Sequence, residues 1–134
     1  MLKKWCLIKK KIKLNKNELI VLAVTPNIAS KILPNLKTPK KTNCILNVHF
    51  KLNEEYKELK LPNGSFFVGV INGVVDWIFK KKNILSITIS AANTLNNLDN
   101  NEISDIVWED IKRTFDLKIS KKPKYKIIRE KMAT

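Results

Sequence analysis

The stretch FFVGVINGVVDWIFKKKNILSITIS, residues 66–90, gives the clearest structural signal in the chain. It divides into three apolar segments separated by Asn72-Gly73 and by residues 81–83. An Asn-Gly pair between apolar segments predicts a type I′ hairpin, because both central residues of that turn need a positive φ that Asn and Gly tolerate best. We therefore expect an antiparallel meander of three strands.

Alternation of apolar and polar residues assigns faces to these strands. In the third strand, leucine and isoleucine alternate with serine and threonine. In the second strand, Val75, Trp77 and Phe79 alternate with the residues of the other face, which are Val74, Asp76, Ile78 and Lys80. We expect Val75, Trp77 and Phe79 to share the apolar face, where each side chain packs in the core or lines an apolar wall; the core is the favoured interpretation.

Residues 44–52 form another alternating segment, which predicts a strand that joins the same sheet. His49 lies on its less apolar face and is the only histidine, so it is the only ordinary acid/base candidate near neutral pH. Its own strand offers no nucleophile or carboxylate on that face, and a partner has to come from a neighbouring strand. A structural or surface role is favoured over a catalytic one.

The residues before this strand predict a strand and a short helix. LIVLAV, residues 19–24, is a continuous apolar run, which is typical of a strand covered on both faces. Thr25-Pro26 predicts the start of a helix over residues 27–33, which ends before Pro34.

A longer helix is expected after the meander. Asp99 and Glu102 have the spacing of a capping box, and apolar residues recur at helical spacing from Ile103 to Phe115. A last strand begins near Tyr125. The expected fold class is α+β, with a mixed, mainly antiparallel sheet backed by helices.

Charge is the most unusual feature of the composition. The 134 residues carry a net charge of +14, but Arg113 and Arg129 are the only arginines. Because arginine is the preferred residue for bidentate contacts with phosphates and bases, we favour solvated surface lysines over a specific nucleic-acid site. A small basic α+β domain that binds nucleic acid or a protein partner remains the alternative.

Cys6, Cys44 and one histidine are too few for a zinc site, and we expect no metal. Two cysteines permit one disulfide, although reduced thiols are favoured without a secretory signal. The first residues are basic and their apolar runs are broken by lysine, so no signal peptide is expected. The sequence has no window of 18 apolar residues, so no transmembrane helix is expected. A cytoplasmic location is expected.

Five segments, in order, resemble flavin-containing amine oxidases and phytoene desaturase-type oxidoreductases, in particular the squalene-associated, hydroxysqualene dehydroxylase-like branch. The segments are LIVLAVTP at 19–26, ILNVHFKL at 45–52, VDWIF at 75–79, SITISAA at 86–92 and IREKMAT at 128–134. Three residues depart from the usual pattern of that family, namely Thr25 in place of proline, Asp76 in place of glutamine and Met132 in place of arginine.

Proteins of this family bind FAD through a G-x-G-x-x-G turn. The three glycines of this chain, Gly64, Gly69 and Gly73, do not form that motif. The resemblance therefore implies an internal fragment, with FAD in the full-length parent but not in this chain. It implies that residues 1–43 join the cofactor domain, that residues 44–127 belong to the substrate domain, and that residues 128–134 start a return strand. A strand or two would then belong to the missing FAD domain.

The resemblance also implies a function for the parent, which would be an FAD-dependent oxidoreductase acting on an apolar isoprenoid of the squalene or carotenoid-precursor type. Trp77, His49 and Phe79 are the candidate substrate-binding residues. A second set, Ala23, Val24 and Thr25, would adjoin the cofactor. No catalytic residue is assigned, the isolated chain is expected to be inactive, and peripheral contact with a membrane is compatible with such a substrate.

Overall fold

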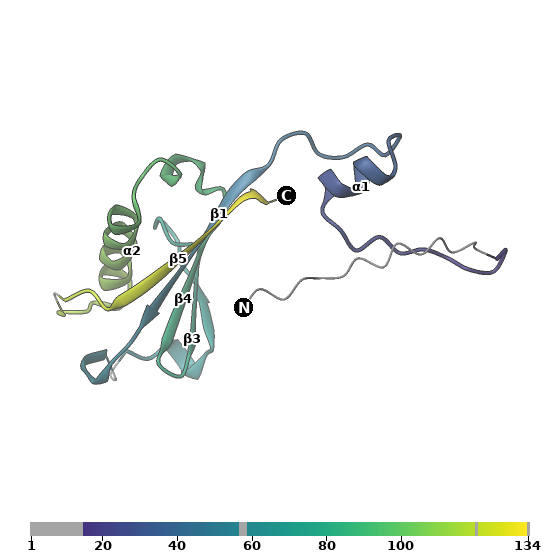
Figure 1. Ribbon diagram of the computed structural model, residues 1–134. Helices are drawn as coiled ribbons and strands as arrows, with labels where there is room; N and C mark the ends of the chain where they lie inside the picture. The colour runs from purple at the N-terminus through teal and green to yellow at the C-terminus, as the bar shows by residue number, and fades with distance from the viewer. Residues whose placement is uncertain (1–14, 57–58, 120, 134) are drawn as a thin grey trace, which may run out of the picture. The chain divides into compact units, whose positions relative to one another are not determined.

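The computed structural model describes residues 15–56, 59–119 and 121–133 (Figure 1). The chain divides after Thr38 into two units. The first unit contains helix α1 (Pro26–Ile32). The second contains strands β1 (Asn43–Lys51), β2 (Phe67–Gly69), β3 (Trp77–Lys81), β4 (Ile84–Ile89) and β5 (Lys124–Ala133), helix α2 (Asn100–Phe115) and short 3-10 turns at Glu54–Tyr56, Pro62–Gly64 and Ala92–Leu95.

Helix α1 begins where the sequence predicts it. Thr25 is the residue before the helix, Pro26 occupies its first turn, and the helix ends at Ile32, ahead of Pro34. The strand expected over residues 19–24 is not formed, and Leu19 is 94% exposed. A strand needs a neighbour for its backbone hydrogen bonds, and no described residue pairs with this segment.

The strands of the second unit form one sheet in the order β2-β3-β4-β1-β5. All four neighbouring pairs are antiparallel, which confirms the expected α+β class. Strand β5 pairs with β1 from Lys51↔Lys124 to Asn43↔Ala133. Residues 128–133, part of the segment 128–134 that we expected to start a return strand, form the second half of β5.

The core lies between one face of the sheet and α2, which Figure 1 shows along one side of the strands. Alternate residues of β1 and β4 are buried there together with most apolar residues of α2, whereas Ile106 and Phe115 of α2 are only partly buried. The buried set includes Leu46, Val48, Phe50, Leu85, Ile87, Ile103, Val107 and Ile111. The Trp108 ring lies 5.2 Å from the Phe50 ring and 5.5 Å from the Tyr56 ring. The predicted apolar stripe of α2 and the packing role of Trp108 are confirmed.

Helix α2 starts with the predicted capping box. The Asp99 carboxylate accepts hydrogen bonds from the backbone N–H groups of Asn101 and Glu102, and the Glu102 carboxylate accepts one from the N–H of Asp99 at 2.8 Å. These bonds satisfy donors that have no partner inside the helix, and they fix where α2 begins.

The connection between β2 and β3 differs from the predicted two-residue turn. Gly69 pairs with Trp77, so residues 70–76 form a longer loop. Asn72 has a φ of 60°, but Gly73 is not in the left-handed region, and the type I′ assignment is wrong. A Cβ atom on Gly73 would lie 2.5 Å from Oδ2 of Asp110. Glycine is required here by the close approach of α2 and not by φ.

Asp110 of α2 holds this loop in place. Its carboxylate accepts a hydrogen bond from the backbone N–H of Val75 at 2.9 Å and pairs with Arg113. The Arg113 guanidinium also donates to the backbone carbonyl of Asn72 at 3.3 Å. Val75 is buried as part of this loop, and the regular alternation of β3 starts only at Trp77.

This displacement reverses the faces expected for β3. Ile78 is fully buried, whereas Trp77 is 44% and Phe79 is 41% exposed. The expectation that Val75, Trp77 and Phe79 share one face is wrong, because the strand does not extend back to Val75. Neither Trp77 nor Phe79 lies in the core.

Candidate functional site

We call the sheet face opposite α2 the open face. Directly opposed residues of antiparallel strands project from the same side of a sheet, so the register gives the composition of this face. One row across the strands contains Gly69, Trp77, Thr88, Asn47 and Ile128. The next row contains Phe67, Phe79, Ser86, His49 and Lys126.

Three aromatic side chains form an aromatic corner on the open face, where β2 and β3 pair. The Phe67 ring is stacked on the Phe79 ring with a centroid distance of 5.8 Å, and it lies 6.1 Å from the Trp77 ring. All three side chains remain substantially exposed. A contiguous exposed aromatic cluster is unusual for a surface that only meets water, and it is suited to hold an apolar partner.

The centre of the open face is polar and partly buried. Nδ1 of His49 and Oγ of Ser86 form a hydrogen bond of 2.9 Å between β1 and β4. One row away, the Thr88 hydroxyl donates to Oδ1 of Asn47, also at 2.9 Å. Among the described residues, Nε2 of His49 has no hydrogen-bond partner. These two pairs, which we call the polar centre, therefore present one free imidazole nitrogen.

Lysines border the polar centre on the side of β5. Lys126 lies opposite His49, and Lys51 lies opposite Lys124 in the row beyond. In the part of the chain that the structure describes, none of these three ammonium groups is paired with a carboxylate. The open face thus passes from aromatic through polar to basic across its strands.

The structure brings together all three candidate substrate-binding residues. Trp77, Phe79 and His49 lie on the open face, with His49 in the same row as Phe79 and two strands away. The sequence did not identify Phe67, Ser86, Asn47 or Thr88 as their neighbours. The polar positions of β1 and β4 alternate in the sequence, but only the register shows that they meet.

The candidate cofactor residues lie in the other unit. Ala23, Val24 and Thr25 are exposed residues ahead of the seven-residue helix α1. A dinucleotide site needs a glycine-rich turn between a strand and a helix, so that backbone N–H groups can reach the pyrophosphate. This segment has no glycine, and residues 19–24 form no strand. The described residues therefore do not fit an FAD pyrophosphate site.

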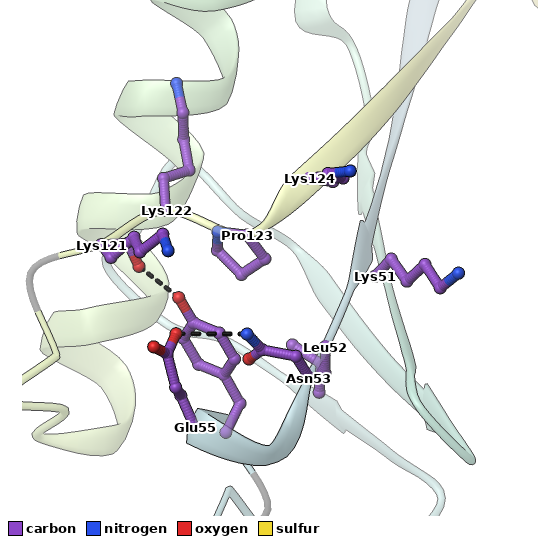
Figure 2. A pocket seen from close by; sticks show the side chains of 9 residues that line it. Lys51, Leu52, Asn53, Glu55, Lys121, Lys122, Pro123 and Lys124 are labelled. Carbon is purple, nitrogen blue, oxygen red and sulfur yellow. Dashed lines mark hydrogen bonds between the residues drawn. The ribbon is translucent and has the colours of Figure 1, made fainter.

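A pocket of about 270 Å³ lies elsewhere, beside the 3-10 turn at Glu54–Tyr56 (Figure 2). The Tyr56 hydroxyl donates to the backbone carbonyl of Lys121, and burial raises the pKa of Tyr56 above its usual value, with a further contribution from Glu55. Figure 2 shows Lys122 extending along α2, where it pairs with Asp105. The hydrogen bond of Tyr56 and the ion pair of Lys122 connect neighbouring segments of the fold, which indicates a structural role for these two side chains.

The described residues contain no group of three or more side chains suited to hold a metal ion. Cys44 is buried and forms no disulfide, and Cys6 lies outside the described residues. Within the described ranges, no helix has the length and apolar character needed to cross a bilayer.

No family model matches the chain. Three curated proteins are similar to it over most of its length. The hydroxysqualene dehydroxylase of Zymomonas mobilis is 32% identical over 92% of this chain and 28% of its own length. The chain resembles part of a hydroxysqualene dehydroxylase. The enzymes of the same name from Rhodopseudomonas palustris and Sinorhizobium fredii are 34% and 30% identical, over 90% and 92% of the chain.

These similarities confirm the resemblance drawn from the five sequence segments. The chain spans only about 28% of the length of the hydroxysqualene dehydroxylases that it matches. The names of these relatives denote enzymes, and their activity belongs to proteins that are much longer than this chain.

Proposed function

We propose that this chain forms a substrate-binding part of an FAD-dependent oxidoreductase that acts on an apolar isoprenoid. The open face would line the substrate cavity, and the aromatic corner would contact the hydrocarbon chain. Similarity to three hydroxysqualene dehydroxylases supports the reaction class. The exposure of Phe67, Trp77 and Phe79 on one face is the observation that carries the assignment of the site.

In this proposal the sheet and the rest of a longer protein have different roles. FAD would supply the redox chemistry, and it would be held by residues outside the described part of this chain. Ala23, Val24 and Thr25 are proposed to approach the cofactor without binding its pyrophosphate. The sheet would position the substrate and exclude water, and neither task needs a strongly acidic or basic group.

A hybrid enzyme tests this proposal. The matching segment of the Zymomonas mobilis relative is replaced by this chain, and consumption of hydroxysqualene is measured along with flavin content. We expect turnover in the hybrid, with a rise in KM when Trp77→Leu removes part of the aromatic corner. Phe66→Leu is the matched control, because Phe66 is 81% exposed but precedes the paired residues of β2.

Two results would contradict the proposal. One is a folded hybrid that retains flavin but does not consume hydroxysqualene. The other is an equal effect of Trp77→Leu and Phe66→Leu on KM, because an equal effect would show that the aromatic corner has no special contact with the substrate.

A further inference from the structure

We propose that His49 and Ser86 bind the hydroxyl group of an isoprenoid alcohol whose chain lies on the aromatic corner. This inference rests on the proposed function and assigns a specificity-determining pair within the same open face. It makes the polar centre the part of the site that distinguishes an alcohol from a hydrocarbon.

The hydrogen bond between His49 and Ser86 sets the orientation of the imidazole ring. With Nδ1 engaged at 2.9 Å by the Ser86 hydroxyl, the ring cannot turn freely, and Nε2 stays available on the open face. A ring held in this way loses little conformational freedom when a ligand binds, which favours recognition through a single hydrogen bond. Ser86 is therefore a positioning residue for His49.

A hydroxyl group matches this site in either tautomer of the ring. If Nδ1 donates to Ser86, Nε2 is an acceptor; if Nδ1 accepts from Ser86, Nε2 carries the hydrogen and donates. A hydroxyl group can donate and accept, so it pairs with Nε2 in both cases. The Asn47 amide, whose oxygen accepts from Thr88, offers its NH₂ group as a donor one row away.

The spacing allows one molecule to reach both parts of the open face. His49 and Phe79 belong to the same row and are separated by β4. Neighbouring strands are about 4.8 Å apart, so this separation is about 10 Å across the sheet. A farnesyl chain is longer than that, and it can cover the three rings while its terminal oxygen lies at the polar centre.

Lys126 could bind a phosphate group, which is the alternative to the hydroxyl group assigned to His49. It lies opposite His49, and its ammonium group has no carboxylate partner among the described residues. A phosphate group would be drawn to Lys126, whereas a neutral hydroxyl group would depend on His49. The two ligand types therefore depend on different side chains.

The experiment is an NMR titration of the full 134-residue chain, with farnesol, farnesene and farnesyl diphosphate as probes and the Trp77 indole N–H and His49 imidazole signals as reporters. We expect farnesol to shift both signals and to bind about tenfold more tightly than farnesene, as one additional hydrogen bond implies. His49→Phe should remove this preference while farnesene still shifts Trp77. Ser86→Ala should reduce the preference, and Lys126→Gln should leave it unchanged.

The outcomes distinguish failure of the proposed function from failure of the hydroxyl assignment. If no isoprenoid probe shifts Trp77, the proposed function fails together with this inference. If farnesol and farnesene both bind at Trp77 with equal affinity in wild type and in His49→Phe, only the hydroxyl assignment is wrong. Tighter binding of farnesyl diphosphate that is lost in Lys126→Gln would also overturn the assignment, in favour of a phosphate. Circular dichroism checks that each variant is folded, and His49→Gln replaces His49→Phe if the latter is not.

Discussion

Gly73→Ala is expected to destabilise the second unit by forcing the Asp110 carboxylate to move. A Cβ atom at position 73 would lie 2.5 Å from Oδ2 and 3.1 Å from Cγ of Asp110, and 3.0 Å from Cγ1 of Val70. The Asp110 side chain is only 4% exposed and is fixed by Arg113 and by the backbone N–H of Val75. It cannot move away without losing contacts that hold the loop over residues 70–76.

The expected loss of unfolding free energy comes from the hydrogen bond between the N–H of Val75 and the Asp110 carboxylate, which Gly73→Ala would break. Leaving the N–H of Val75 buried without a partner costs about 1–3 kcal/mol. Alanine restricts the unfolded chain more than glycine does, which offsets about 0.4–1 kcal/mol of that cost. The expected net loss in the free energy of unfolding is about 1–2 kcal/mol for Gly73→Ala. Gly64→Ala is the matched control, since Gly64 has a φ of 67° and no atom would lie within 4 Å of its Cβ.

A double-mutant cycle with Asp110→Ala tests whether the destabilisation by Gly73→Ala arises from contact with the Asp110 carboxylate. Urea unfolding is measured for wild type, for both single variants and for the double variant. Once Asp110 is truncated, Gly73→Ala should have little further effect, which gives a coupling energy of about 1 kcal/mol or more. Gly64→Ala costs about 1–2 kcal/mol through left-handed strain alone, and it should be additive with Asp110→Ala. Additive behaviour of Gly73→Ala and Asp110→Ala would refute the argument.

Three further predictions concern packing, pH and the cofactor. Trp77→Leu should cost less than about 1 kcal/mol of unfolding free energy because Trp77 is 44% exposed, whereas Trp108→Leu should cost about 3 kcal/mol through lost core volume; equal costs in urea unfolding would contradict the assigned faces. Burial and the charge of Glu55 raise the pKa of Tyr56 in the folded state, so the unfolded state should release that proton first and stability should fall as the pH rises above about 10. Tyr56→Phe should show a smaller alkaline loss in the same assay, and an unchanged loss would exclude Tyr56 as its source. The purified chain should not retain FAD, and stoichiometric flavin absorbance would contradict this.

The sequence predicted the elements whose signals are local. The capping box of α2 needs only Asp99 and Glu102 at the correct spacing, and the start of α1 needs only Thr25 and Pro26. Each signal involves residues within one helical turn, so the rest of the chain does not need to be known. The strand expected over residues 19–24 is not formed, because a strand depends on neighbours that often lie far away in the sequence.

The candidate site was predictable only in part for the same reason. Alternation identified His49 as a residue of the less apolar face of β1, but its partner Ser86 lies 37 positions away on β4. Local patterns do not give the register that brings them to 2.9 Å. Phe67 was likewise an ordinary apolar residue until its pairing with Phe79 placed both rings on the open face.

We expect the interaction between Asp110 and the loop over residues 70–76 to influence which side chains the open face presents. The N–H of the buried Val75 donates to Asp110, and two residues later β3 begins with the exposed Trp77. A shift of one residue in this connection would exchange the two faces of β3, placing Ile78 outside and Trp77 and Phe79 in the core. We therefore expect the aromatic corner to depend on a carboxylate of the helix on the opposite side of the sheet. A variant that weakens the contact between Asp110 and Val75 should disturb the aromatic corner without altering any residue of the open face.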